Sequence, residues 1–315
     1  MSVAMSMVSP DNHNKKVALI NGPTASGKSA LALELAKKQP SIIINADSAQ
    51  VYRDLQILSA RPTEAEMGGV PNRLYGYIDG AKACSAARWA RDAKAEIEAA
   101  HEASKLPILV GGTGLYVRVL LDGIAPIPEI DPDIRNEVRK LDTLDAHTAL
   151  LNEDPASARR LNATDSSRVK RALEVIRSSG KPMEHWHQNM QGGIADDILL
   201  KPLLLLPPRE WLYARCDLRF ELMMQTGAKA EVEALLERGL PDDRPVMRAI
   251  GVPDIRAFLE GKIDEATAIE QSQMATRRYA KRQFTWFRNQ SPSDWARAES
   301  NIDNDNINDI VRLLQ

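Results

Sequence analysis

Cysteine is scarce in this sequence: Cys84 and Cys216 are the two thiols in 315 residues. Two isolated cysteines form neither a disulfide framework nor a C-x-x-C metal motif, which favours a reducing compartment. Long apolar runs are missing as well, since none approaches the roughly 20 residues that span a bilayer. The first 14 residues lack the apolar segment of a secretion signal. We therefore expect a cytoplasmic protein that does not enter a membrane.

A strong excess of one charge is also absent. Lys and Arg total 41 against 43 for Asp and Glu, so the net charge of -2 excludes a globally basic nucleic-acid-binding protein. It does not exclude a local basic face, because electrostatic steering depends on where the charges lie. The chain is 43% hydrophobic and 27% charged, as in ordinary globular proteins, and its 315 residues predict about two domains.

Short apolar segments alternate with helical patterns along much of the chain. Continuous apolar strands separated by amphipathic helices are typical of a parallel sheet. We therefore predict an α/β fold with a parallel sheet core flanked by helices. The expected strands cover residues 16–20, 41–44, 106–110 and 198–206, and the expected helices cover residues 30–38 and 85–102 and begin again at residue 115.

The alternation stops after residue 121. Pro126, Pro128 and Pro132 exclude a regular helix there, and the readable segments of residues 133–179 are then all helical. We therefore predict a discontinuous core of residues 15–121 and 198–315, interrupted by a helical insertion of residues 122–197. Beyond residue 208 we expect long helices separated near Gly239 and Gly251. Residues 185–187 contain two histidines without metal-ligand spacing and are expected to form a loop.

A glycine-rich motif follows the first expected strand. Residues 22–29 read GPTASGKS and match the pattern G-x-x-x-x-G-K-[ST], in its required place between a strand and a helix. In this pattern backbone N–H groups contact phosphate oxygens, the lysine reaches the outer phosphate, and the last hydroxyl can hold Mg²⁺. The motif predicts a P-loop that binds phosphate without specifying the compound. Its members are Gly22, Pro23, Thr24, Ala25, Ser26, Gly27, Lys28 and Ser29.

An aspartate follows the second expected strand. At the carboxyl end of a parallel strand, Asp47 faces the ligand crevice of the sheet, where it can act as a base. The polar and aromatic residues 48–52 after it suit a ring with amide-like edges. Two other roles stay open for Asp47, as a helix N-cap or in the outer shell of a magnesium ion. The third strand ends in Gly-Gly-Thr, without the carboxylate that nucleotide hydrolases and kinases place there.

Residues 276–288 read TRRYAKRQFTWFR, with five basic and four aromatic residues. Spacing of four places Arg277 over Lys281 and Arg278 over Arg282, so cations share one face of a helix. Cations for phosphates and aromatic rings for stacking are what single-stranded RNA loops require. A solvated basic face above an aromatic core fits the same pattern.

Two arginines lie one helical turn apart further upstream. Arg215 and Arg219 would share a helix face, and two stacked guanidinium groups suit a diphosphate. Pairing with the nearby carboxylates of Asp217 or Glu221 is the alternative.

Taken together, these segments resemble the tRNA dimethylallyltransferase (tRNA isopentenyltransferase) family. Six segments carry the resemblance, in order along nearly the whole chain. They are GPTASGKS at 22–29, NADSAQVY at 45–52, VGGTGLY at 110–116, SRVKRALEV at 167–175, RCDLRFELM at 215–223 and TRRYAKRQFTWFR at 276–288.

The resemblance implies a Mg²⁺-dependent transfer of a dimethylallyl group from dimethylallyl diphosphate to N6 of adenosine 37, in tRNAs that read codons starting with U. It implies that Asp47 is the general base. Thr24, Lys28 and Arg219 would neutralise the departing diphosphate, with Ser29 acting through Mg²⁺. The insertion would grip the anticodon stem-loop while the adenine leaves the loop. The implied contacts to tRNA are Asp47, Ser48, Ala49, Gln50, Thr113, Arg135, Ser167, Arg168, Val169, Lys170, Arg171, Arg248, Gly251, Lys281, Arg282, Gln283, Trp286 and Arg288.

One departure from the family pattern follows residues 248–251. Val252 and Pro253 stand where the family usually has tyrosine and a polar or basic residue, which removes an aromatic contact to RNA. We expect a monomer. The alternatives are a small-molecule kinase, an isopentenyltransferase acting on free adenine nucleotide, and an RNA-binding module without catalysis.

Overall fold

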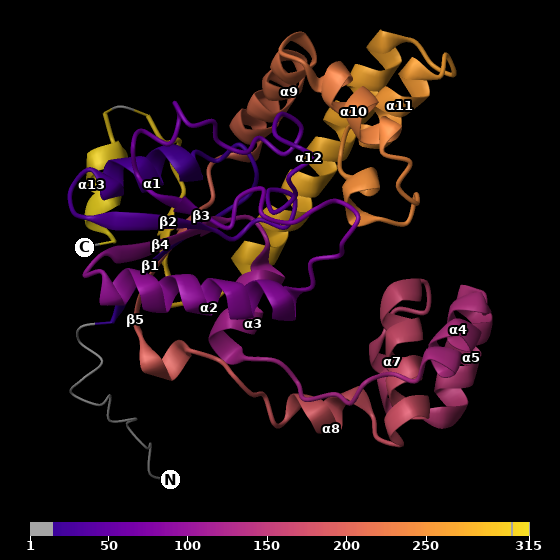
Figure 1. Cartoon of the computed structure of the whole chain (residues 1–315). Helices are drawn as coiled ribbons and strands as arrows, with labels where there is room; N and C mark the ends of the chain where they lie inside the picture. Colours follow the sequence, from indigo (N-terminus) through magenta and orange to yellow (C-terminus); the bar gives the residue numbers. More distant parts are fainter. Residues whose placement is uncertain (1–14, 304, 315) are drawn as a thin grey trace. The chain divides into compact units, whose positions relative to one another are not determined.

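The computed structural model describes residues 15–303 and 305–314 (Figure 1). The chain forms two compact units, one made of the residues up to Leu120 and from Ala195 onward, the other of Leu121–Ile194. The predicted insertion ends at residue 197. Residues Ala195–Asp197 instead form a 3-10 turn, η2, that belongs to the first unit and leads into its sheet.

The first unit is built on a six-stranded sheet in the order β3-β2-β4-β1-β5-β6, in which every neighbouring pair is parallel. The central strands β1, β2 and β4 are almost entirely buried, which explains why each reads as an uninterrupted apolar run. The predicted parallel α/β fold is confirmed. The strands are β1 (Lys16–Asn21), β2 (Ser41–Asn45), β3 (Asn72–Arg73), β4 (Leu106–Gly111), β5 (Leu199–Leu205) and β6 (Ala296–Ala298).

Helices cover both faces of this sheet (Figure 1). On one face lie α1 (Lys28–Ala36) and α13 (Ile307–Arg312), and on the other lie α2 (Ala86–Glu102) and α3 (Gly114–Asp122). Leu35 and Ile310 belong to the apolar core that joins the first pair of helices to the strands. On the opposite face Trp89 is fully buried, and its indole N–H donates to the Asn45 carbonyl at 2.8 Å. This bond fastens α2 to the end of β2.

The remaining helices of the first unit follow β5. They are α9 (Arg209–Gln225), α10 (Ala228–Glu237), the 3-10 turn η3 (Pro245–Arg248), α11 (Val252–Leu259) and α12 (Glu265–Gln290). Cys216 of α9 and Ala280 of α12 pack together around the methyl group of Ala25, so the two helices reach the loop that follows β1. The expected breaks near Gly239 and Gly251 are present. A further break at Gly227, where φ is 120°, was missed because no proline or loop-like composition accompanies it.

The second unit is a separate bundle of short helices: α4 (Pro132–Lys140), α5 (Thr143–Glu153), α6 (Pro155–Arg160), α7 (Ser166–Ser179) and α8 (Met183–His187). An aspartate caps each of the first four, accepting a backbone hydrogen bond from the opening turn. Val138, Leu150 and Leu173 form its core. The expectation of a loop at residues 185–187 was wrong, because they end α8, where the Trp186 indole N–H donates to Ser179.

Two strands were missed in the sequence. β3 has two residues and β6 has three, which is too short for a hydrophobic period to show. Both pair at the edges of the sheet and extend it without altering the core.

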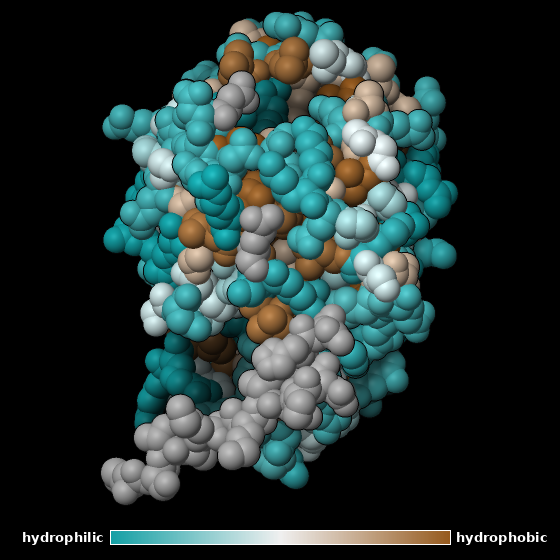
Figure 2. Space-filling view, turned by 90° about the vertical axis from the view of Figure 1, so that its left-hand side faces the viewer, coloured by the Kyte–Doolittle hydropathy of each residue, from teal (hydrophilic) through white to brown (hydrophobic). Residues whose placement is uncertain are grey.

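The surface agrees with the composition. Figure 2 shows a largely hydrophilic face on which hydrophobic groups are interspersed among hydrophilic ones. Among the described residues, no helix is long and apolar enough to cross a membrane.

A carboxylate of α10 holds the loop that precedes β3. Glu231 accepts hydrogen bonds from the backbone N–H groups of Gln56, Ile57 and Leu58. Gln50 supports the same loop by donating its amide to the carbonyls of Ser59 and Ala60.

Glu231→Ala leaves three backbone donors without their partner. Because an unsatisfied buried donor costs about 1–3 kcal/mol, we expect the free energy of unfolding in urea to fall by about 2 kcal/mol. The matched control is Glu233→Ala, an exposed position on the same helix, which should change stability by less than about 0.5 kcal/mol. Equal effects of the two variants would contradict the role of Glu231.

Candidate active site

Three loops meet at the carboxyl edge of the sheet because their strands β2, β4 and β1 are neighbours. The loop after β1 carries the glycine-rich motif, the loop after β2 carries Asp47, and the turn after β4 carries Gly112 and Thr113. Ala46 donates its N–H to the Val110 carbonyl at 2.8 Å, and its own carbonyl accepts from the Thr113 N–H at 3.3 Å. This edge of an open α/β sheet is the usual place for a ligand.

The glycine-rich loop ends at Gly27, whose φ of 96° is left-handed, and α1 begins at Lys28. Gly22 passes so close to β5 that a Cβ there would lie 2.5 Å from the Leu205 carbonyl oxygen. Ala25 also has a left-handed φ, of 63°, which costs a residue other than glycine some strain. The tight loop leads directly into the amino end of α1, the kind of backbone arrangement that binds phosphate in other proteins.

Lys28 folds back into this loop and donates from Nζ to the Pro23 carbonyl at 2.6 Å. Burial lowers the pKa of Lys28 to about 8, while the Asp47 carboxylate raises it and the Arg219 guanidinium lowers it. The same buried surroundings lower the pKa of Arg219. Two desolvated cations, Lys28 and Arg219, therefore lie within electrostatic range of each other.

The two arginines of α9 have different partners. Arg215 donates from Nε to the Ala25 carbonyl at 3.1 Å and stacks over the Trp211 ring, so it supports the strained part of the loop. The alternative pairing with Asp217 or Glu221 is not what the structure shows, because Asp217 pairs with Arg277 at 2.6 Å and Glu221 accepts from the Gln273 amide at 3.1 Å. Arg219 lies within electrostatic range of Glu66.

Asp47 opens a turn and does not cap a helix, so the N-cap alternative is wrong. Its Oδ1 accepts from the Ala49 N–H at 2.9 Å, and the Asn45 side chain binds both its N–H and its carbonyl. Thr113 holds the next residue, since its Oγ1 accepts from the Ser48 N–H at 2.9 Å. The backbone around Asp47 is therefore fixed from both sides, and its carboxylate lines a cavity.

This cavity has a volume of about 390 Å³. Its walls combine Thr24 of the loop after β1 and the segment after β2 with groups of α3, α9, α12 and residues 245–250. That volume and mixture suit a small organic ligand. The lining residues are Thr24, Asp47, Ser48, Ala49, Tyr52, Leu58, Ser59, Ala60, Cys84, Tyr116, Cys216, Phe220, Met223, Pro245, Arg248, Ala249, Ile250, Thr276, Tyr279 and Arg282.

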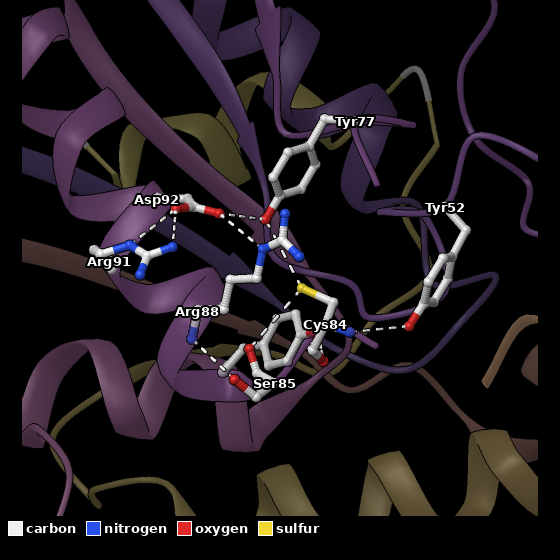
Figure 3. A network of polar contacts seen from close by, with 8 residues as sticks. Tyr52, Tyr77, Cys84, Ser85, Arg88, Arg91 and Asp92 are labelled. Atoms are coloured by element: carbon white, nitrogen blue, oxygen red, sulfur yellow. Dashed lines mark hydrogen bonds and ion pairs between the residues drawn. The ribbon is translucent and has the colours of Figure 1, made fainter. Parts of the chain in front are cut away.

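One wall of the cavity is a polar network around Cys84 that the sequence did not reveal (Figure 3). The Cys84 N–H donates to the Tyr52 hydroxyl at 3.3 Å, and the Tyr116 hydroxyl donates to the Cys84 carbonyl at 3.4 Å. The Tyr77 hydroxyl donates to Asp92 at 3.0 Å. Burial raises the pKa of all three tyrosines, so they stay neutral. No motif spacing marks these residues, because the fold alone brings them together.

Helix α12 forms another wall with Tyr279 and Arg282, the guanidinium lying 5.6 Å from the ring centroid. Lys281, Arg282 and Arg288 are exposed, whereas Phe287 is fully buried. The helix therefore has both a solvated basic face and an aromatic side in the core. The Arg118 guanidinium lies 5.2 Å from the centroid of the Trp286 ring. Gly114 leaves space for this ring, because a Cβ at Gly114 would lie 2.1 Å from a ring carbon.

Three implied tRNA contacts are buried. Val169 belongs to the core of the second unit, Gly251 lies against Leu58 and Phe220, and Gln283 is 5% exposed. The side chains of Val169 and Gln283 and the Gly251 backbone therefore offer little surface in this structure. In the second unit Ser167 and Arg168 are exposed, and Arg135, Lys170 and Arg171 are half-buried. The side chain of Val252 is also fully buried, so the departure at that position leaves the start of α11 intact.

A magnesium ion would find one protein ligand at the loop. No cluster of three His, Cys, Asp or Glu side chains that could hold a metal occurs in the part of the chain that the structure describes. Ser29 is exposed in the first turn of α1 and lines a small cavity with Glu66. This donor set fits Mg²⁺, which is commonly bound through one or two protein oxygens together with substrate phosphates and water.

Comparison with known proteins shows which family this chain belongs to. A model of the family described as IPP transferase matches residues 50–290. The chain belongs to the IPP transferase family. It is 58% identical over 277 residues to a tRNA dimethylallyltransferase of Novosphingobium aromaticivorans, covering 87% of this chain and 99% of that protein. A tRNA dimethylallyltransferase of Sphingopyxis alaskensis is 58% identical over 300 residues, covering 95% of this chain and 98% of the relative. The resemblance inferred from the six motifs is confirmed.

Solved structures of the family agree. A tRNA isopentenylpyrophosphate transferase from Bacillus halodurans is 33% identical with a TM-score of 0.69, and the alignment covers 95% of each chain. A eukaryotic dimethylallyltransferase, described as acting on tRNA, is 29% identical with a TM-score of 0.75, over 86% of this chain and 69% of that one.

The Lys28 pKa of about 8 predicts how anion affinity depends on pH. Below this pH the free loop carries the ammonium charge, and above it the charge is lost. We therefore expect the affinity for inorganic diphosphate, measured by calorimetry, to fall as pH rises from 7 to 9.5. Lys28→Arg keeps its charge over this range and should show a flatter profile. An equally steep fall in that variant would contradict the assignment to Lys28.

Proposed function

We propose that this enzyme transfers a dimethylallyl group from dimethylallyl diphosphate to N6 of adenosine 37, beside the anticodon of tRNAs that read codons starting with U. One observation carries the proposal. A single cavity joins Thr24 of the P-loop and Asp47 to Tyr279 and Arg282 of the basic helix α12. Donor and acceptor groups would meet there, and we propose that the enzyme acts as a monomer. Free tRNA as substrate favours the cytoplasm as its location.

The donor has a charged part and an apolar part, and the groups in and beside the cavity suit both. Its diphosphate would lie on the P-loop, facing the side chains of Thr24, Lys28 and Arg219. Its five-carbon chain would lie against apolar residues of the lining, among them Phe220 and Met223. A kinase acceptor would instead require polar groups at that end, and the turn after β4 carries no carboxylate for nucleotide hydrolysis.

The transfer exchanges one bond for another. The N6 amine attacks C1 of the dimethylallyl group, the C1–O bond breaks, and the diphosphate leaves with the electron pair. The amine then loses a proton to the Asp47 carboxylate. Negative charge grows on the departing oxygen, so Thr24, Lys28 and Arg219 contribute most when they are fixed before the reaction begins. A Mg²⁺ ion held by Ser29 would add positive charge beside the diphosphate.

The acceptor adenine would reach Asp47 from the side of α12. Because a base in the stack of an anticodon loop cannot enter a cavity, it has to leave the stack. Exposed Lys281, Arg282 and Arg288 would hold nearby phosphates, and Arg168, Lys170 and Arg171 of the second unit would hold the anticodon stem-loop.

Asp47→Asn keeps the size of the side chain and removes its ability to accept a proton. We expect kcat for transfer to tRNA to fall about 100-fold or more, the usual contribution of a general base. The dissociation constant of tRNA should change little. To measure activity, tRNA is incubated with enzyme, Mg²⁺ and dimethylallyl diphosphate. The tRNA is then digested, and its nucleosides are identified by mass spectrometry. Unchanged turnover in Asp47→Asn would refute the base.

The same assay tests the substrates with the wild-type enzyme. A dimethylallyl group found on adenosine 37 supports the proposal. Prenylation of free AMP with tRNA left unmodified, or consumption of ATP in place of transfer, would overturn it.

Lys281→Ala should weaken tRNA binding and lower the slope of log K against log salt by about 0.7–1, as expected when one phosphate contact is lost. The matched control is Lys38→Ala, an exposed lysine that follows α1. Its slope should equal that of the wild type. If Lys281→Ala leaves the slope unaltered, Lys281 makes no phosphate contact.

A further inference from the structure

Gln283 occupies an unusual place in the basic helix. Its neighbour Arg282 is exposed, yet Gln283 itself is 5% exposed and points into the protein. Its Oε1 accepts from the Thr24 N–H at 2.8 Å, and its Nε2 donates to the Gly112 carbonyl at 2.8 Å. Both ends of the amide are therefore used, and they join two loops of the active site that follow different strands.

Gly112 is shaped to receive this amide. A Cβ at Gly112 would lie 2.2 Å from Nε2 of Gln283 and 3.2 Å from Oδ2 of Asp47. The amide and the base thus approach the same glycine from two directions. The next residue, Thr113, holds the turn of Asp47 through Ser48. A change at Gln283 would consequently be felt both at the P-loop and at the base.

The Thr24 peptide is the more sensitive of the two ends. The P-loop is held at three successive residues, since Pro23 accepts from Lys28, Thr24 donates to Gln283 and Ala25 accepts from Arg215. Of these contacts, only that of Gln283 reaches across to the segment beside the base. The backbone N–H of Thr24 is also withheld from phosphate, so its side chain is the group that faces the cavity.

We propose that Gln283 is a positioning residue that locks the Thr24 peptide of the P-loop to the Gly112 turn, so that the diphosphate site and Asp47 keep a fixed separation. This rests on the proposed function and assigns Gln283 a role other than contact with RNA. A buried side chain that must donate and accept at once has few substitutes, because methionine does neither and ionised glutamate cannot donate.

The first test is Gln283→Met, which keeps the length of the side chain and removes both hydrogen bonds. We expect kcat to fall about 100-fold, because small misplacements of reacting groups cost that much. The dissociation constant for inorganic diphosphate should rise about tenfold. The dissociation constant of tRNA should stay within about threefold of the wild type. Gln271→Met, at an exposed position of the same helix, is the matched control and should leave all three values unchanged.

The second test is Gln283→Glu, which keeps the acceptor for Thr24 and loses the donor when ionised. The Asp47 carboxylate and the Tyr279 hydroxyl face this position, and the wild type contains both. The ratio of variant to wild-type kcat therefore reports the new carboxyl group together with its effect on Asp47. We expect the ratio to rise as pH falls from 8 to 6, because a protonated glutamate donates to Gly112 again. This test serves equally if Gln283→Met does not fold.

A rise of tenfold or more in the tRNA dissociation constant with kcat intact would make Gln283 an RNA contact and overturn the proposal. A pH-independent ratio for Gln283→Glu would overturn it too. The diphosphate measurement needs no transfer to tRNA. If the wild type fails to prenylate tRNA, the proposed function falls, while a weakened diphosphate affinity in Gln283→Met still supports the link between Gln283 and the P-loop.

Discussion

The chain after β2 crosses directly over the end of β4, and the rest of the site depends on that crossing. Gly111 stands beneath it, where a Cβ would lie 2.0 Å from the Ala46 carbonyl oxygen. Two backbone hydrogen bonds of Ala46, to Val110 and Thr113, close the contact. Asp47 is the next residue, so this backbone contact and the Asn45 side chain together set its position. Strand adjacency then brings the P-loop alongside, since β1 pairs with β4 in parallel at the same edge.

Side chains from distant helices then fix the P-loop. Its left-handed Ala25 is held at the carbonyl by Arg215 of α9, and its methyl group is enclosed by residues of α9 and α12. Thr24 is held by Gln283 of α12. The helices that follow β5 thus hold a loop that lies near the start of the chain.

The parts of this arrangement that local patterns encode were predictable. Buried strands read as apolar runs, and Gly22–Ser29 matched a pattern that contains the glycines its tight turn needs. The Cys84 network and the pairing of Asp217 with Arg277 were not predictable, because each joins elements that are remote in sequence. Gln283 shows the limit most clearly. In the sequence, Gln283 lies among basic and aromatic residues of one helix. Its side chain points into the protein because its amide donates to the carbonyl of Gly112, 171 residues away. A related limit applies to Val169 and Gly251. A motif identifies a stretch of residues, whereas the fold determines which of them are exposed, and these two are buried.

Electrostatics explains how such a site suits a departing diphosphate. Burial depresses the pKa of Lys28 to about 8 and lowers that of Arg219, so before the donor arrives both cations are poorly compensated. An anion bound between them would restore the balance and favour the protonated form of Lys28. The tyrosines around Cys84 have raised pKa values and stay neutral. Asp47 is then the carboxylate that lines the cavity within the described chain, so in the proposed reaction it would receive the proton that the attacking amine releases.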